Sequence, residues 1–374
     1  MRALVSTMLA LCALAMASHA RADETCIGCH AMRSEARLRM PVSARSHDVH
    51  ADANVGCTDC HGGDPDEPTV RAHDLGRGFR GVPDVLGVAQ MCAPCHDGSR
   101  EHLVDVASAY RQGRHARAAA LDHASASCVS CHGAHGIEHH DAASAPVARE
   151  HVADTCGACH ASAEHMAASG LPTDQLAQWR ASIHGAAFTT DPTSAPTCST
   201  CHDAHRNAAG LAATEACSQC HRPIREAFDR GPHAAHFEHL GFLDCAECHG
   251  SHEIRAADAT LLSGIGAACA RCHGPGQEAF VRVQRIEALA DRLDAARAAL
   301  SRDDPRRTTL IAALHALDVD ALEAALNELP EVPTAPAPTP AESHARIPDW
   351  IVLGFGAAAL VSLGASWLVR RRRS

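Results

Sequence analysis

Cys26-Ile27-Gly28-Cys29-His30 is the first of nine copies of one pentapeptide, Cys-x-x-Cys-His, and these copies decide the fold. They use eighteen of the nineteen cysteines in the chain. At this content of cysteine and histidine, about 0.1 copies are expected by chance. The later copies are Cys57–His61, Cys92–His96, Cys128–His132, Cys156–His160, Cys198–His202, Cys217–His221, Cys245–His249 and Cys269–His273.

This pentapeptide is typical of covalent haem attachment. The two thiols form thioether bonds to the haem vinyl groups, and the adjacent histidine becomes the first axial ligand of the iron. Disulfide frameworks and structural zinc sites do not require a histidine after every second cysteine. The predicted haem-binding cysteines are Cys26, Cys29, Cys57, Cys60, Cys92, Cys95, Cys128, Cys131, Cys156, Cys159, Cys198, Cys201, Cys217, Cys220, Cys245, Cys248, Cys269 and Cys272, and the axial histidines are His30, His61, His96, His132, His160, His202, His221, His249 and His273. The sequence therefore predicts nine covalently attached haems c.

The copies are of two alternating kinds. Odd-numbered copies recur at similar intervals along the chain, whereas even-numbered copies follow an upstream histidine, and three of the four continue as Cys-His-x-x-His. The alternation predicts a two-haem module used four times and followed by a ninth haem. Repetition on this scale predicts an elongated, stacked array rather than a single globule.

Residues 21–276 form the predicted nonahaem domain. About 28 residues per haem are too few to bury an ordinary side-chain core around each one. We therefore expect the haems to be the core, wrapped by short helices and loops. The predicted fold class is mainly α-helical and irregular, with few strands.

The flanking segments have other compositions. An apolar run that ends at Ser18-His19-Ala20 predicts a signal peptide, residues 1–20. Apolar residues at every third or fourth position predict a helical hairpin over residues 277–330, which we interpret as a spacer without chemistry. A proline-rich linker follows over residues 331–348.

The predicted chain ends in a transmembrane helix, residues 349–370, whose central twenty residues carry no charge. Arginines follow it directly, so residues 371–374 are expected in the cytoplasm and the haem domain in the periplasm of a bacterium. Export suits the chemistry, because haem c is attached outside the inner membrane. The formal charge of −11 gives no indication of nucleic-acid binding.

The second axial ligand of each iron decides between electron transfer, which uses a closed site, and catalysis, which needs an open one. Twenty histidines lie outside the motifs, which is enough for nine closed sites. The predicted distal ligands are His47, His115, His184 and His233 upstream of even motifs, His135, His205 and His252 in Cys-His-x-x-His, and His73 in the first module. A ninth ligand is expected from His102 or His165. We expect His50 to be a neighbour of the haems and His315 to lie on the surface.

Ala181-Ser182-Ile183-His184-Gly185, followed by residues 196–205, resembles the recurring unit of the multihaem c-type cytochromes with doubled Cys-x-x-Cys-His motifs. The resemblance extends over about residues 24–276. It implies closely spaced haems, most of them with two histidine ligands, that pass electrons along the periplasmic side of a membrane.

Two functions follow from these expectations. The first is a membrane-anchored relay between a quinol-oxidising donor in the inner membrane and periplasmic cytochromes or reductases. The alternative is a reductase or oxidase of a nitrogen or sulfur oxyanion with one open haem. The chain has no lysine, which excludes a Cys-x-x-Cys-Lys site, and Tyr110 is its only tyrosine for a cross-link to haem. We expect an electron-transfer protein rather than an enzyme.

Overall fold

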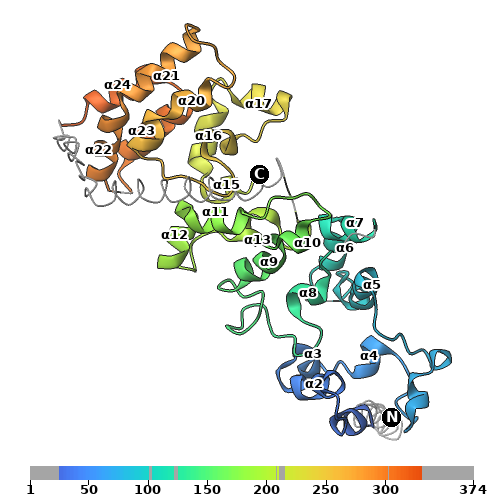
Figure 1. The fold of residues 1–374 in the computed structure, drawn as a ribbon. Helices are drawn as coiled ribbons and strands as arrows, with labels where there is room; N and C mark the ends of the chain where they lie inside the picture. The colour runs from blue at the N-terminus through green and yellow to red at the C-terminus, as the bar shows by residue number, and fades with distance from the viewer. Residues whose placement is uncertain are drawn as a thin grey trace, which may run out of the picture. The chain divides into compact units, whose positions relative to one another are not determined.

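The computed structural model describes residues 25–100, 103–121, 125–207, 209, 215–301 and 303–330. Within these residues the chain is a series of short helices joined by loops, without a strand (Figure 1). The bounds of the helices are α2 Ala36–Ala44, η1 Arg45–His47, α3 Val49–Asp52, α4 Cys57–His61, η2 Val70–His73, η3 Leu75–Arg77, α5 Val85–His96, α6 Val106–Gln112, α7 Arg114–Ala119, α8 Cys128–His132, α9 Val152–His160, α10 Ala163–Met166, α11 Gln175–Ala181, α12 Ile183–Thr190, α13 Cys198–His202, α15 Cys217–Cys220, α16 Arg222–Asp229, α17 Ala234–Leu240, α18 Cys245–His249, α19 Ala259–Ser263, α20 Ile265–Cys269, α21 Glu278–Ala288, α22 Ala290–Ala299, α23 Pro305–His315 and α24 Val319–Asn327.

The predicted fold class needs two corrections. The few expected strands are absent from the described residues, and no helix among them is both long and apolar enough to cross a membrane. The longest of them, α5, has 12 residues. That corresponds to about 18 Å, whereas the hydrocarbon core of a bilayer is about 30 Å thick. The transmembrane ending of the predicted fold class is therefore not supported by any described helix. The segments predicted as signal peptide, linker, span and tail lie outside the described residues.

Each even-numbered motif forms a five-residue helix of its own, α4, α8, α13 or α18. The third helical residue caps three of these helices from within. Its side chain accepts a hydrogen bond from the backbone N–H of the residue before the motif, from Gly56 to Asp59 (2.7 Å) and from Thr197 to Thr200 (3.1 Å). One otherwise unsatisfied N–H at the helix start is thereby paired. The x positions of Cys-x-x-Cys-His thus help the motif fold locally.

A residue with positive φ follows each even-numbered motif helix. Gly62, Gly133 and Gly250 have φ of 64°, 81° and 77°, and Asp203 has 55°. Glycine adopts this conformation without the steric cost that a Cβ brings. The chain therefore turns sharply after the motif histidine.

The third and fifth motifs follow a different pattern, because each of them ends a helix that began earlier. In α5 and α9, several residues precede the two cysteines and the histidine. The side chain of Asp84 caps α5 by accepting a hydrogen bond from the N–H of Gly87 (2.6 Å). These two odd-numbered motifs therefore differ in local structure from the even-numbered ones.

Residues 25–276 bury few large side chains. Most of their buried apolar residues are alanines, and the one cluster that lies wholly within them consists of Ala89, Tyr110 and Ala116. Such small side chains cannot supply the apolar burial that an ordinary domain of this length has. This composition fits a region whose core is haem.

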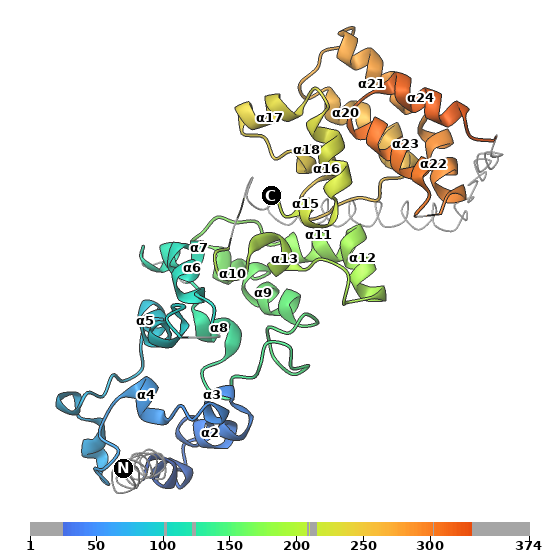
Figure 2. The same cartoon turned by 180° about the vertical axis from the view of Figure 1, so that it is seen from behind.

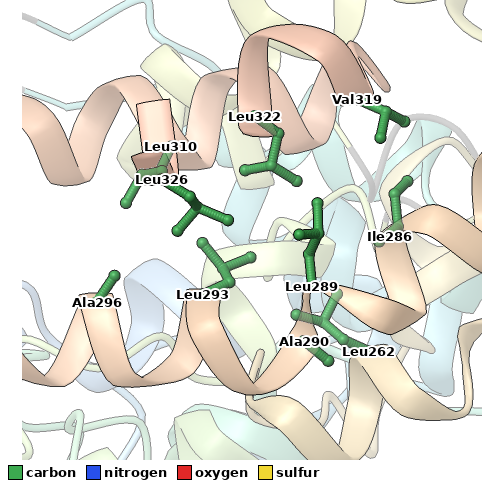
Figure 3. Packing of buried hydrophobic residues seen from close by; sticks show 10 residues of the cluster. All are labelled: Leu262, Ile286, Leu289, Ala290, Leu293, Ala296, Leu310, Val319, Leu322 and Leu326. Carbon is green, nitrogen blue, oxygen red and sulfur yellow. The ribbon is translucent and has the colours of Figure 1, made fainter. Parts of the chain in front are cut away.

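Residues 277–330, here called the hairpin, form the four helices α21 to α24 and do have a side-chain core. Leu293, Leu310 and Leu322 are at most 1% exposed, and they face one another between the helices (Figure 3). Leu262 of α19 belongs to the same cluster. Figures 1 and 2 both show α23 beside α16, and the two helices are in contact. The hairpin thus packs on the last haem-binding module.

Candidate haem-ligand sites

Each of the nine motif histidines faces the ring of a second histidine. The two ring centroids lie between 5.9 and 6.3 Å apart in every pair. With the motif histidine first, the pairs are His30–His73, His61–His135, His96–His50, His132–His205, His160–His115, His202–His252, His221–His184, His249–His315 and His273–His233.

This separation fits an iron held between two imidazoles. A bond of about 2.0 Å from iron to each nitrogen, with the ring centre about 1.1 Å behind it, places the centroids about 6.2 Å apart. Rings stacked directly on one another would lie much closer. The residues present therefore suit haems with two histidine ligands.

Seven of the eight predicted distal histidines belong to these pairs. The exception is His47, which the structure does not bring to a described motif histidine. Its place opposite His96 is taken by His50, three residues later. The Nδ1 of His50 donates a hydrogen bond to the carboxylate of Asp48 (3.1 Å), which leaves its Nε2 for a metal.

The pair of His249 also contains a histidine that was not expected to be a ligand. His315, predicted to lie on the surface, faces His249 at 6.1 Å. Of the two candidates proposed for the ninth ligand, His165 is exposed, and its Nδ1 lies 2.9 Å from the hydroxyl oxygen of Ser162. His102 lies outside the described residues.

His73 reaches His30 on the loop that follows the second motif. A Cβ at Gly62 would overlap the carbonyl oxygen of Gly78, and one at Gly63 would lie 2.6 Å from the carbonyl oxygen of Ala72. Only glycine allows the chain to fold back so closely. Gly62 and Gly63 therefore occupy the two positions that lie between the histidines of Cys-His-x-x-His in the other even-numbered motifs.

Burial favours the neutral form of several of these rings. It lowers the pKa of both members of the pairs His132–His205 and His160–His115. The pKa of His249 falls furthest, to about 4. A neutral imidazole has a free lone pair for a metal, so these histidines are ready to bind iron at neutral pH.

The pairs follow a regular pattern along the chain, which differs between even-numbered and odd-numbered motifs. A histidine of an even-numbered motif is paired with one that lies after the next even-numbered motif, as in His132 and His205. From the third motif on, a histidine of an odd-numbered motif is paired with one that lies before the preceding even-numbered motif, as in His160 and His115. Each module therefore completes the sites of its neighbours.

Distal histidines of two neighbouring sites come together in what we call a ligand hub, two chain segments that each carry one distal histidine. In the first hub, the N–H of Val49, beside His50, donates to the carbonyl of Ile137, two residues after His135 (2.8 Å). Asp48 also accepts a hydrogen bond from the N–H of Gly136 (2.9 Å). The two distal ligands are thus fixed relative to one another.

The third hub repeats this hydrogen bond, and the second has a close backbone approach between the corresponding segments. In the third, the N–H of Ile183 donates to the carbonyl of Ile254 (2.9 Å), which joins the segments of His184 and His252. In the second, a Cβ at Gly113 would lie 2.8 Å from the carbonyl oxygen of His205, so the segment before His115 packs closely on it. A repeated backbone contact therefore sets each pair of distal ligands.

Motif thiols lie side by side within a module. The thiols of Cys92 and Cys128 hydrogen-bond to one another, and so do those of the corresponding pairs Cys156–Cys198 and Cys217–Cys245. The first cysteine of an odd-numbered motif thus touches the first cysteine of the next even-numbered one. The haems of one module would be attached at adjoining points.

Motif thiols of consecutive modules also lie near one another. Burial raises the pKa of Cys131, and the nearby Cys159 of the next module raises it further. The same holds for Cys201 and Cys220. Together with the pairs inside each module, these neighbours give a continuous succession of motifs through this part of the chain.

Tyr110 has a structural role in this arrangement. Its ring is buried against Ala89 and Ala116, and its hydroxyl donates to the carbonyl of Ala126 (2.8 Å). Burial raises the pKa of the phenol, so it stays protonated. A buried hydroxyl with a partner is accounted for by packing alone.

Comparison with known proteins agrees with this geometry. Residues 190–274 match the family model described as cytochrome c3. This match supports a multihaem c-type cytochrome. The match likewise supports covalently bound haem c and a role in electron transfer. The chain has no significant match among curated proteins or solved structures.

A sequence signal distinguishes His50 from His47. A residue that often begins helices or turns stands two positions before His50, His115, His184 and His233, in the order Asp48, Gly113, Ser182 and Gly231. The first three of these residues cap the short helices α3, α7 and α12. Arg45 stands at that distance from His47. The cap, rather than the distance to the next motif, identifies this ligand.

Proposed function

We propose that this protein is a nonahaem electron relay on the periplasmic side of the bacterial inner membrane. It would take electrons from a quinol-oxidising donor in that membrane and deliver them to periplasmic cytochromes or reductases. The observation that carries the proposal is the second imidazole facing each of the nine motif histidines.

The proposed site residues have separate tasks. When bound, each haem supplies an iron that changes its oxidation state by one electron. The two cysteines of each motif would hold the macrocycle, and the motif histidine and its partner would be the two protein ligands of the iron. A filled position leaves no place for a small substrate, so this arrangement favours electron transfer over catalysis.

Adjacency of the motifs supports a relay rather than isolated redox sites. The thiol pair Cys156–Cys198 joins two motifs of one module, and Cys201 lies near Cys220 of the next module. Side chains of successive motifs would thus hold their haems next to one another. Such an arrangement suits stepwise transfer between partners at different points of the array.

The periplasmic location rests on chemistry and on the chain's motifs. Haem c is attached outside the inner membrane, so a chain with nine attachment motifs has to be exported. A quinol-oxidising donor is proposed because quinols are the membrane's electron carriers, while this chain's described residues carry redox motifs only for haem. Both partners are proposals that the next experiment tests.

The test has two parts, both in a stopped-flow instrument. Fully reduced protein is mixed with an oxidised soluble c-type cytochrome, and we expect rapid reoxidation. Oxidised protein is mixed with nitrite, hydroxylamine or sulfite, and we expect no spectral change. Reduction by a quinol is expected only in the presence of a quinol-oxidising membrane fraction. Sustained turnover of one of the small substrates would overturn the proposal in favour of a multihaem reductase or oxidase.

A further inference from the structure

We propose that the hairpin is a ligand-donating cap: His315 of α23 is the distal ligand of the haem on Cys245, Cys248 and His249. The proposal rests on the proposed function, which requires a closed site at each motif. It assigns chemistry to a segment that lies outside residues 190–274, the part matched by the family model. The hairpin would then take the place of a missing tenth motif.

The pairing rule creates the need for such a residue. His61, His132 and His202 face histidines located after the fourth, sixth and eighth motifs. By the same rule, His249 needs a histidine located after a tenth motif, and the chain has nine. His315 stands in that place, 6.1 Å from His249.

Ring orientation puts His315 in the same class. In the three other pairs of even-numbered motifs the two ring planes are nearly parallel, with angles of 18°, 3° and 21°. The angle between His249 and His315 is 14°. The pairs of odd-numbered motifs have angles between 32° and 83°. The hairpin histidine therefore matches the ligands that even-numbered motifs supply.

Backbone packing around His315 also reproduces a ligand hub. In the second hub, Gly113, two residues before His115, packs on the backbone beside His205. In the same way Gly231, two residues before His233, packs on Ala316, with a Cβ there only 3.2 Å from the Ala316 carbonyl oxygen. His233 and His315 thus form the fourth hub.

Local contacts aim the ring of His315. Its Nδ1 donates a hydrogen bond to the carbonyl of Ile311 one turn earlier (2.8 Å), so Nε2 is the nitrogen left for the iron. The hairpin core holds α23 through Leu310, which is 0% exposed. Outside this core, Arg285 bridges Asp320 and Glu323 of α24 at 2.7 and 2.8 Å. The histidine is therefore carried by a firmly packed element.

The test is replacement of His315 by glycine in the full haem-loaded protein, followed by electron paramagnetic resonance. We expect one haem in nine to become high-spin in the oxidised protein and to bind carbon monoxide when reduced. Added imidazole should fill the opened position and restore the low-spin signal. A His315→Met variant should stay low-spin with a changed spectrum, because a thioether can replace the imidazole.

His165→Gly is the matched control, because it removes an exposed histidine without a facing ring. A haem count and circular dichroism keep loss of folding separate from loss of a ligand. If the unmodified protein is low-spin throughout and His315→Gly leaves it so, only the role of the hairpin is refuted. If the unmodified protein already has a high-spin haem, the closed relay itself fails.

Discussion

Single residues decide whether a haem site is closed. The motif cysteines and histidines could be predicted from the sequence because attachment needs them at fixed spacing within one pentapeptide. A distal ligand has no such local constraint. His47 and His50 are close neighbours in the chain, yet the carboxylate of Asp48 orients only His50, opposite His96. A local capping pattern thus carried more information than the spacing to the next motif.

His50→Ala should open the haem of the third motif, because it removes the only ring that faces His96 among the described residues. We expect one haem in nine to become high-spin and to bind carbon monoxide after reduction, as measured by absorption and paramagnetic resonance. His47→Ala is the matched control and should leave the spectrum unchanged. The opposite result for the two variants would assign the ligand to His47.

At the scale of the elements, the packing of separate chain segments determines which module supplies each distal ligand. Repeat position predicted histidines such as His115 and His184 as ligands, since each recurs before an even-numbered motif. It could not predict that His115 faces His160, because that pairing depends on how separate segments pack. The sequence predicts only a spacer for the hairpin, because repeat position does not show how separate segments pack. His315 has no repeated counterpart in the sequence, and only the fold brings it to His249.

Leu322→Ala should loosen the hairpin and, through it, the site at His249. Leu322 is 0% exposed, and truncating such a side chain typically costs about 2–5 kcal/mol. In a thermal melt followed by absorption, we expect one haem to become high-spin at a lower temperature than in the unmodified protein. Val281→Ala, at a position of the same hairpin that is 49% exposed, should leave the melt nearly unchanged. Equal melts for both variants would contradict the coupling.

At the scale of the whole molecule, the haems would replace the large side-chain core that the described part of residues 25–276 lacks. Length and motif density predicted this, and the alanine-rich interior of residues 25–276 agrees. The transmembrane ending of the predicted fold class rested on a run of apolar residues alone, and no described helix is long and apolar enough to support it.

Preventing haem attachment should unfold the two parts unequally. Residues 25–276 would lose their core, whereas residues 277–330 keep the cluster around Leu293, Leu310 and Leu322. In limited proteolysis of the chain made without attachment, we expect cleavage in the haem-binding region to be at least about tenfold faster than in the hairpin. In the haem-loaded protein both parts should resist. Equal resistance of both parts without haem would show a side-chain core that the fold does not contain.

The central claim is that all nine irons have two histidine ligands, and electron paramagnetic resonance of the oxidised protein with a haem count tests it most directly. The account predicts nine low-spin haems. The nearly parallel pairs, such as His132 and His205 at 3°, should give rhombic spectra, and the crossed pair of His50 and His96 at 83° should give a signal with one large g value. A high-spin signal amounting to one haem or more in the intact protein would contradict the account.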